Sequence, residues 1–301
     1  CLACALAGSA EPLAQVLSDF VKSNGGGPSA TVIGRGFQTS SPDAAMINGA
    51  MSHALDYDDI TRAVKGHPTA VLLPGTLALA EEEGASGKDV LLAYMLGFEV
   101  ACSVGDAMSV AYADDLGWHP TGPLGALGAA AAASHILRLD AQQTAMAISL
   151  AASQAAGLRA NFGTMTKPLH AGMTCRDGVT AVQLAQRGLT AGDQIVEHPL
   201  GFAATVLGQG VYDLDSMADN MGKPFRIQDA LMIKKYPCCG GNHAMLDSLF
   251  SLMRDNGFTH EDVASAEVDQ SYFSVVMLYQ EPEDGLKGKF SAKYNVAAAL
   301  V

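Results

Sequence analysis

Hydrophobic and small residues recur at helical spacing through most of the first 230 positions, and almost no stretch there alternates apolar and polar residues as a strand does. This pattern predicts a succession of amphipathic or buried helices rather than a sheet. The predicted helices cover residues 10–22, 44–55, 69–83, 88–110, 124–137, 141–156 and 178–187. A short apolar stretch at 31–36 is predicted to be extended. This part of the chain is therefore expected to be all α.

The pattern changes in the C-terminal part of the chain. A helix is predicted over 244–256, with Asn242 able to cap its start and Gly257 ending it. Residues 264–273 then alternate polar and apolar positions, which predicts a half-buried strand. A smaller α+β unit is therefore expected here.

Two domains follow from this change of pattern. We expect a mainly α chain with an all-helical domain over 1–230, followed by the start of a smaller α+β domain over 231–301. The sequence opens and closes inside apolar helical runs, at 1–7 and at 294–301. We therefore expect the chain to be part of a longer protein, truncated at both ends.

Four loops carry the polar residues with catalytic potential, and each lies at the mouth of a predicted apolar helix. They hold Asp56 and His67, then His119, then Lys167 and His170, and finally Lys234 and His243. The third loop is predicted over 161–176 because Gly163, Pro168 and Gly172 interrupt it. A cation on a loop held by a rigid scaffold is a common site of chemistry. If the four loops converge, they form a cleft with several cations, a carboxylate and no evident set of metal ligands.

Each of these residues also has a purely structural interpretation. His67 and His119 each precede a proline, which restrains the backbone and therefore the direction of the imidazole. Such a histidine can act as an acid or base near neutral pH, or it can be a hydrogen-bonded loop residue. Lys167 can likewise be a solvated loop lysine. Asp56, Asp58 and Asp59 can be a solvated helix end, although the helix dipole disfavours acids there.

The composition narrows the choice of partners. The 301-residue chain is 49% hydrophobic, and its 18 basic and 31 acidic residues give a net charge of −13. This argues against nucleic acid and against an anionic membrane surface, because both need a basic face. A small anionic substrate remains compatible, since a few cations in a dry pocket can outweigh a distant acidic surface. The six cysteines lack zinc-ligand spacing, and no uncharged apolar run reaches the length of a membrane span, so we expect a cytoplasmic protein with reduced thiols.

Five segments, in order along the chain, resemble the signatures of the MmgE/PrpD family. They read Ala-Leu-Asp-Tyr-Asp-Asp from 54 with Gly-His-Pro from 66, Gly-Trp-His-Pro-Thr-Gly from 117, Met-Thr-Lys-Pro-Leu-His-Ala-Gly from 165, Lys-Lys-Tyr-Pro-Cys-Cys from 234, and Lys-Phe-Ser-Ala-Lys-Tyr from 289. The family includes 2-methylcitrate dehydratase, cis-aconitate decarboxylase and iminodisuccinate epimerase. The resemblance implies a large helical domain with a smaller α+β lid, an active site between them, a homodimer, and no metal or organic cofactor.

The resemblance also implies roles for individual residues. The family chemistries share the formation or quenching of a carbanion-like centre next to a carboxylate, which preorganised cations favour in the transition state. The implied catalytic residues are Asp56 and His67 for proton transfer, His119 as a second acid/base or carboxylate donor, and Lys167 and Lys234 as clamps for carboxylates. The implied substrate contacts are His170, His243, Tyr294 and Arg62.

Three functions remain open on this basis. A cofactor-independent hydro-lyase similar to 2-methylcitrate dehydratase, acting on a small di- or tricarboxylate, is the preferred interpretation because dehydration is the commonest named activity in the family. The alternatives are an epimerase or racemase of the iminodisuccinate type and a non-catalytic carboxylate-binding or dimerisation module. Two departures weaken a decarboxylase assignment: Ile60 stands where that branch has threonine, and Cys239 stands where it has histidine.

Overall fold

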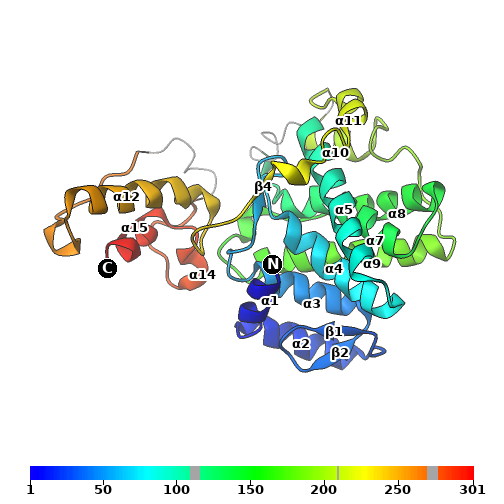
Figure 1. Ribbon diagram of the computed structural model, residues 1–301, viewed down its shortest axis with the longest axis horizontal. Helices are drawn as coiled ribbons and strands as arrows, with labels where there is room; N and C mark the ends of the chain where they lie inside the picture. Colours follow the sequence, from blue (N-terminus) through cyan, green and yellow to red (C-terminus); the bar gives the residue numbers. More distant parts are fainter. Residues whose placement is uncertain (109–115, 209, 270–276) are drawn as a thin grey trace.

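The computed structural model describes residues 1–108, 116–208, 210–269 and 277–301. It is mainly helical, with 61% helix and 5% strand, as the hydrophobic pattern predicts. The ribbon shows a large helical body and, beside it, a smaller group of helices from the C-terminal part of the chain (Figure 1). Residues from both contribute to the site described below.

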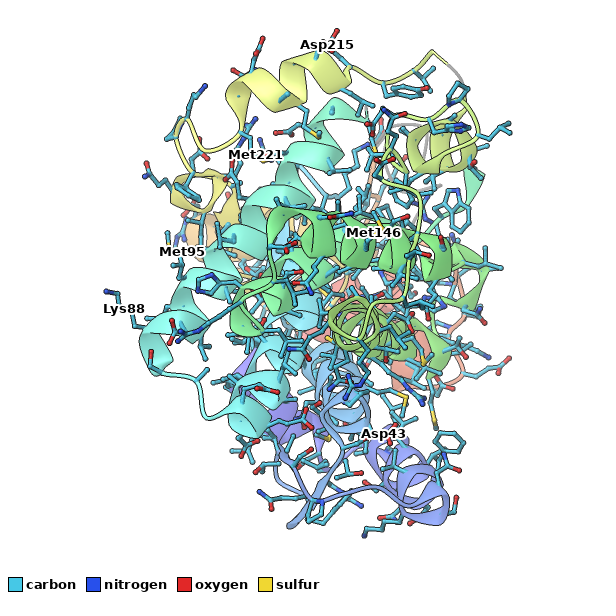
Figure 2. The ribbon with its side chains drawn as sticks, turned by 90° about the vertical axis from the view of Figure 1, so that its right-hand side faces the viewer. Asp43, Lys88, Met95, Met146, Asp215 and Met221 are labelled. Carbon is cyan, nitrogen blue, oxygen red and sulfur yellow. The ribbon has the colours of Figure 1, made fainter. Side chains whose placement is uncertain are left out.

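Four helices that pack on one another form the centre of the body. They are α3 (Ser41–His53), α4 (Pro68–Glu83), α7 (Thr121–Ile136) and α9 (Thr166–Gln186). Around them lie α1 (Leu2–Gly8), α2 (Pro12–Asn24), α5 (Gly87–Ala107) and α8 (Ala141–Gln154). A view turned by 90° shows α8, marked by Met146, across the middle of the body and the start of α5, marked by Lys88, at its edge (Figure 2).

Small residues allow the central helices to approach closely. Gly172 of α9 faces α3, where an added Cβ atom would lie 2.3 Å from the backbone oxygen of Met46. Gly178 of the same helix faces α7, where an added Cβ would lie 2.6 Å from the Cβ of Ala129. The alanine- and glycine-rich sequence therefore gives a dense helical core, which fixes the ends of the helices that carry the site.

The prediction of a loop over 161–176 is wrong from Thr166 onward. A short 3-10 helix, η1 (Arg159–Asn161), is followed by α9, which runs without a break from Thr166. Pro168 lies in the first turn of α9, where a backbone N–H has no helical partner in any case, so proline is tolerated. Gly172 does not interrupt α9, because the absence of a side chain there is what close packing on α3 requires. Lys167 therefore sits in the rigid first turn of a helix.

Within the described residues, two short antiparallel pairs of strands accompany the helices. β1 (Ala30–Val32) pairs with β2 (Phe37–Thr39), which covers part of the segment predicted to be extended. β3 (Ile60–Thr61) pairs with β4 (Leu231–Met232), with Ile60 opposite Met232. This second pair joins segments that are 170 positions apart, and it brings the loop with Lys234 to the loop with Asp56.

The chain beyond α9 forms short elements before it reaches the smaller group of helices. These elements are α10 (Phe202–Leu207), α11 (Leu214–Asn220) and η2 (Arg226–Gln228), and the smaller group contains η3 (Gly240–Asn242), α12 (His243–Asn256), η4 (His260–Asp262), α14 (Gly285–Gly288) and α15 (Ala292–Leu300). Gly257 ends α12 in a left-handed conformation, as predicted. Asn242 precedes α12, but its side chain does not cap the helix; its amide instead donates to the backbone oxygen of Lys289 at 3.2 Å.

The strand predicted over 264–273 is not found where it can be checked. Residues 264–269 have no regular secondary structure, and 270–273 lie outside the described residues. Alternation in so short a segment indicates a strand only if a partner strand lies beside it, and the described part of the chain provides none there.

Among the described helices, α5 alone is long and apolar enough to cross a membrane when judged by length and composition. Of that apolar stretch, 61% is buried inside the protein. Gly97 of α5 and Gly128 of α7 face each other, and an added Cβ on Gly97 would lie 2.7 Å from the Gly128 backbone oxygen. The burial and the packing are those of a core helix.

Candidate active site

Asp56 lies just after α3, and its carboxylate is the centre of the candidate site. Its φ is 51°, a left-handed conformation that is uncommon outside glycine, so the surrounding structure must hold it. Asp56 Oδ1 lies 3.1 Å from Lys167 Nζ, 2.9 Å from Lys234 Nζ and 3.4 Å from His67 Nε2. Asp56 Oδ2 has no hydrogen-bond partner among the described residues. Three potential cations therefore converge on one oxygen atom of this buried residue.

Lys234 comes from the loop after β4, and its side chain is fully buried. Its Nζ donates to Asp56 Oδ1 at 2.9 Å, to the Asp56 backbone oxygen at 2.8 Å and to the Cys238 backbone oxygen at 2.9 Å. An ammonium group has three N–H donors, so all of them are used within the protein. Burial acts to lower the pKa of Lys234, but Asp56 outweighs it and the pKa is raised. Lys234, expected to clamp a substrate carboxylate, is therefore placed as a support for Asp56.

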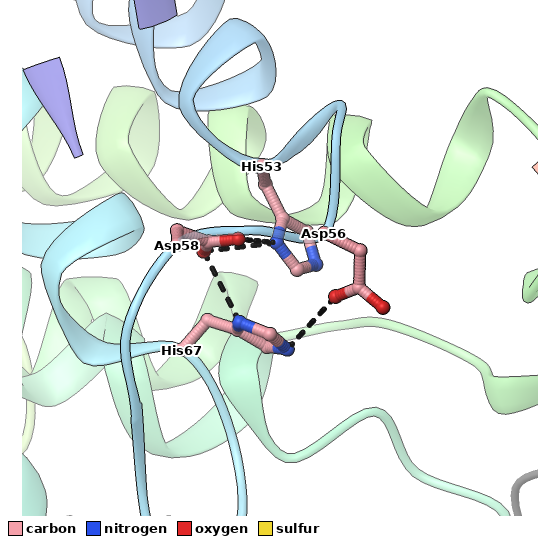
Figure 3. A group of neighbouring side chains, drawn as sticks. All are labelled: His53, Asp56, Asp58 and His67. Atoms are coloured by element: carbon pink, nitrogen blue, oxygen red, sulfur yellow. Dashed lines mark hydrogen bonds and ion pairs between the residues drawn. The ribbon is translucent and has the colours of Figure 1, made fainter. Parts of the chain in front are cut away.

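Five side chains close into a ring of polar contacts, which we call the polar ring: Lys167, His53, Asp58, His67 and Asp56. Lys167 Nζ lies 2.7 Å from His53 Nε2, and His53 Nδ1 lies 3.0 Å from both oxygens of Asp58. Asp58 Oδ2 lies 3.1 Å from His67 Nδ1, and His67 Nε2 faces Asp56. Figure 3 shows four of these side chains, with His53 and His67 each directed at Asp58. The contact between Asp56 and Lys167 completes the polar ring.

The geometry fixes the protonation of His53. An ammonium group has no lone pair, so the His53 Nε2 atom must accept from Lys167, and the ring proton must lie on Nδ1, where it donates to Asp58. Burial is the main cause that lowers the pKa of His53, to about 3; Lys167 and His67 lower it further, and Asp58 opposes them. His53 is therefore neutral near pH 7, with a defined tautomer.

Both carboxylates of the polar ring stay ionised. Burial alone would raise the pKa of Asp56, but Lys167, Lys234 and His67 together outweigh it and hold this pKa well below its usual range. Burial likewise acts to raise the pKa of Asp58, and His53 and His67 outweigh it. Asp56 Oδ1 is already engaged by two ammonium groups and faces His67 as well. Asp56 is therefore better suited to hold cations in place than to take a proton from carbon.

His119 is a buried histidine of the cavity wall with one ring nitrogen that has no partner in the described part of the chain. Its Nδ1 atom lies 3.1 Å from Nδ1 of His170, and its Nε2 atom has no partner among the described residues. Burial, followed by the charge of Lys167, lowers the pKa of His119 well below its usual value and that of His170 to about 4. Two neutral imidazoles share one hydrogen bond, so the direction of that bond decides whether His119 Nε2 is a donor or an acceptor.

These side chains border a cavity of about 760 Å³ between the helical body and the start of the smaller group of helices. Its basic lining residues are Arg62, Lys65, Arg159, Lys167 and Lys234, and its acidic ones are Asp56 and Asp247. Five minus two gives a lining charge of +3 before any histidine is counted, in a chain whose net charge is −13. A concave site of one sign focuses the field and attracts ions of the opposite sign.

Two aromatic rings form the apolar wall next to Lys167. The centroids of Phe162 and Phe290 lie 5.1 and 5.2 Å from Lys167 Nζ. Phe162 comes from the end of η1, while Phe290 follows α14 in the smaller group of helices. A ring face attracts an ammonium group and excludes water. The smaller group of helices therefore contributes directly to the surroundings of Lys167.

The structure brings most of the expected site residues to one place, with two exceptions. Asp56, His67, His119, Lys167 and Lys234 all line the cavity, and so do Arg62 and His243, whose Nε2 atom is buried without a partner. His170 does not line the cavity but contacts His119 from behind. Tyr294 does not line it either: it lies on α15, is half exposed and packs over Gly288.

Comparison with known proteins identifies the family. Residues 1–215 match the model of the MmgE/PrpD N-terminal domain. The chain belongs to the MmgE/PrpD family. It is similar to a cis-aconitate decarboxylase-like protein of Aspergillus oryzae, with 30% identity over 84% of this chain and 55% of the relative. It is also similar to human cis-aconitate decarboxylase, with 33% identity over 70% of this chain and 44% of the relative, and to the Aspergillus terreus enzyme, with 28% identity over 100% of this chain and 65% of the relative. The chain thus spans about half the length of the first of these relatives.

Two members of the polar ring were missed by sequence reasoning in this MmgE/PrpD protein. His53 ends α3, where a histidine is favoured by the helix dipole and needs no further explanation. Asp58 was noticed only as part of an acidic helix end. Their spacing could have indicated the contact. Asp58 follows His53 by five positions, and a loop that turns back after α3 can bring the two side chains together. Phe162 and Phe290 gave no polar signal at all.

Four residues of this MmgE/PrpD chain could in principle hold a metal ion. His53, Asp56, Asp58 and His67 offer ligand atoms within 4.8 Å of one another. The His53 Nε2 atom, however, accepts from Lys167, and two ammonium groups lie within 3.1 Å of Asp56 Oδ1. A divalent cation there would face two adjacent positive charges. The donor set therefore fits a hydrogen-bonded polar ring better than a cation.

Proposed function

We propose that this chain carries the active site of a cofactor-independent lyase that acts on a small di- or tricarboxylate. The observation that carries the proposal is the basic cavity in an acidic protein, with the polar ring at its inner end. A substrate with two or three carboxylates matches the sign of the lining. The similarity to cis-aconitate decarboxylases supports the same class, because cis-aconitate is a tricarboxylate.

Dehydration is the reaction we propose first. The His119 Nε2 atom takes a proton from the carbon next to a carboxylate, in the tautomer in which His119 Nδ1 donates to His170. The electrons of the broken C–H bond form a C=C bond, and the hydroxyl on the neighbouring carbon leaves as water with a proton from His67. Negative charge grows on the substrate carboxylate during the first step, and the Lys167 ammonium stabilises it. Asp56 and Lys234 hold Lys167 and His67 in place.

Decarboxylation is the second candidate, because the relatives found are named cis-aconitate decarboxylases. In this reaction a C–C bond breaks, carbon dioxide leaves, and the remaining carbanion takes a proton from His119 in its other tautomer. The cations that neutralise the substrate are the same. Ile60 and Cys239, the two positions at which this chain departs from the decarboxylase branch, both line the cavity. They therefore give this site a more apolar wall, and we rank dehydration first.

The test is to incubate the full-length protein in deuterated water with citrate, 2-methylcitrate and cis-aconitate and to follow the products by proton NMR. A new vinyl signal without loss of carbon dioxide supports dehydration, and a vinyl signal with carbon dioxide release supports decarboxylation. Deuteration next to a carboxylate with inversion and no elimination would replace the lyase by an epimerase. Binding without exchange or turnover would leave a carboxylate-binding module.

A matched pair of variants connects the activity to this cavity. Lys167→Ala removes the ammonium beside His53 and Asp56, and we expect it to abolish the vinyl signal. Lys88→Ala alters an exposed lysine in the first turn of α5, and we expect it to behave as the wild type. Equal activity of the two variants would place the chemistry elsewhere.

A further inference from the structure

His53 and Asp58 are part of the polar ring, but neither lines the cavity. Both side chains are completely buried. His53 contacts Lys167 at 2.7 Å with one ring nitrogen and Asp58 at 3.0 Å with the other. Asp58 in turn lies 3.1 Å from His67 Nδ1. The pair therefore connects, from behind the cavity wall, two residues that do line it.

The contacts of His53 and Asp58 help to fix the positions of Lys167 and His67, the two residues that line the cavity. A lysine side chain has about four rotatable bonds, so the position of its ammonium group is fixed only if hydrogen-bond acceptors hold it. For Lys167 those acceptors are His53 Nε2 and Asp56 Oδ1, at 2.7 and 3.1 Å. The imidazole of His67 lies between two carboxylates, with Nδ1 3.1 Å from Asp58 and Nε2 3.4 Å from Asp56, so their charges favour this orientation although Nδ1 makes no well-aligned hydrogen bond. A substrate therefore meets groups whose directions are set before it arrives.

Both ring nitrogens of His53 are occupied by contacts with charged side chains. Asp58 faces it from the following loop and Lys167 from α9, while the rings of His67 and His119 lie 4.1 and 5.7 Å from its own ring. The positive charge on one side and the negative charge on the other polarise the imidazole, so each of its two hydrogen bonds strengthens the other.

We propose that His53 and Asp58 are positioning residues of this active site. His53 carries its proton on Nδ1 and couples Lys167 to Asp58, and Asp58 orients His67 through the nitrogen that faces away from Asp56. The depressed pKa of His53, caused by its burial, agrees with a neutral ring. The kinetic consequence rests on the proposed lyase function, whereas the tautomer of His53 does not.

The tautomer is tested on the full-length protein labelled with ¹⁵N-histidine. Two-bond ¹H–¹⁵N spectra distinguish a neutral ring protonated at Nδ1 from one protonated at Nε2 and from an imidazolium, and His53→Asn assigns the signal. We expect the Nδ1-protonated neutral form at pH 7. An Nε2-protonated ring would overturn the proposal, because it could not accept from Lys167. An imidazolium would overturn it as well, because Lys167 would then have to be the acceptor.

Two variants of His53 separate its two contacts. Asparagine can place an N–H near the Nδ1 position but has no atom near Nε2, so it keeps the link to Asp58 and loses Lys167. Glutamine can place its amide oxygen near Nε2 but has no donor near Nδ1, so it keeps Lys167 and loses Asp58. Misplacing a catalytic group by about 1 Å costs about 10²-fold in rate, so we expect each variant to lose about 10²-fold in kcat with KM nearly unchanged.

The matched control is His135→Asn, at the end of α7 and outside the cavity lining. We expect its kcat to equal that of the wild type. If His53→Asn and His53→Gln keep wild-type kcat per folded molecule, or lose activity only in step with folded protein, the positioning role is overturned. If the wild-type protein turns over no carboxylate of the panel, the proposed lyase function fails, and the NMR result still decides the arrangement of His53.

Discussion

The two ends of the cavity are built differently. At the inner end, the polar ring and Lys234 are buried, and most of their polar atoms have fixed partners before a substrate arrives. At the outer end, Arg62 and Lys65 are exposed and extend from the loop between β3 and His67. The backbone of that loop is fixed by a hydrogen bond in which the Thr61 N–H donates to the Gly66 oxygen at 3.1 Å.

Under the proposed lyase function, this difference implies that the two ends of the cavity act in different ways. Fixed donors and charges cost no reorganisation when charge develops, so the inner end is suited to lowering the barrier. Exposed, rotatable cations act mainly through attraction in water, where each contact is worth little. The outer end is therefore suited to selecting and holding a substrate by its charge. Each prediction below bears on this contrast between the ends.

Lys234→Met should produce the largest loss of stability. It removes the partner of three acceptors, and breaking a buried charge pair costs about 3 kcal/mol of the free energy of unfolding. Urea unfolding of the purified protein measures it. Lys235→Met is the matched control, because Lys235 is an exposed residue whose ion pair with Asp247 is exposed as well, and its loss should change little. Equal effects of the two variants would contradict the assignment of a buried inner end.

Lys167→Ala should have the largest effect on turnover. It removes the one cation of the inner end that also faces the aromatic wall, and the loss of a preorganised donor costs about 10³-fold in kcat. Steady-state kinetics give the change, and circular dichroism should show an unchanged helix content. Lys88→Ala serves as control. Unchanged kinetics in Lys167→Ala would remove this residue from the site.

Acidification below about pH 6.5 should lower the free energy of unfolding through His53, a buried residue of the inner end. The pKa of His53 is lowered to about 3 in the folded state, while an unfolded histidine titrates near 6.5. The unfolded state therefore binds more protons as the pH falls below about 6.5, and stability decreases; at pH 5 this costs about 2 kcal/mol for His53. The depressed pKa values of Asp56 and Asp58 act in the same direction, but only once the pH falls below about 4.

Urea unfolding at pH 7.5 and pH 5 measures this loss. His53→Asn lacks the titrating ring, so its free energy of unfolding should fall by about 2 kcal/mol less than that of the wild type between the same two pH values. The same pH dependence in both proteins would show that His53 is not buried as a neutral ring.

Arg62→Gln should affect binding rather than chemistry. We expect the KM for a tricarboxylate to rise about tenfold, or about 1.4 kcal/mol, with kcat nearly unchanged, because Arg62 is an exposed cation of the lining. The effect should shrink at high salt, which screens exposed charges. Arg254→Gln, an exposed change on α12, is the control. A fall in kcat with constant KM would move Arg62 to the inner end.

Chelation should have the smallest effect of all. Two of the groups that could bind a cation, His53 and Asp58, are hydrogen-bonded to each other, and two ammonium groups lie next to Asp56, so we expect turnover to be unchanged after treatment with a chelator. The full-length protein is assayed before and after treatment. Activity that is lost and then restored by a divalent metal would contradict the polar ring as described.

Most helices of the body could be predicted from periodicity, because helical spacing of apolar residues is a local property. The prediction failed at 161–176, where Pro168 and Gly172 are usual signs of a break. A proline in a first turn and a glycine at a close helix contact are both compatible with a helix, and only the position of α3 reveals which case applies. The placement of Lys167 on a rigid turn was therefore not predictable.

The site was predicted in part. Seven of the nine residues expected at the site line the cavity; the four polar loops drew attention to most of them, and the resemblance to the MmgE/PrpD family gave them roles, whereas spacing alone left each open to a structural interpretation. The resemblance did not indicate that Lys234 has no free donor or that Tyr294 lies away from the cavity. Nor did it point to His53, because its two partners are determined by packing.

By itself, the sequence determined the helical class, the acidic net charge, the family and the set of cations available for a site. The tertiary structure alone decided which polar atoms meet. Lys167 reaches His53 across 114 positions, and Lys234 reaches Asp56 across 178. Such pairings depend on how α3, α9 and the β3–β4 pair stack, and a hydrogen bond forms only within a few tenths of an ångström of the right distance. Local sequence does not contain that information, because it results from the packing of the whole core.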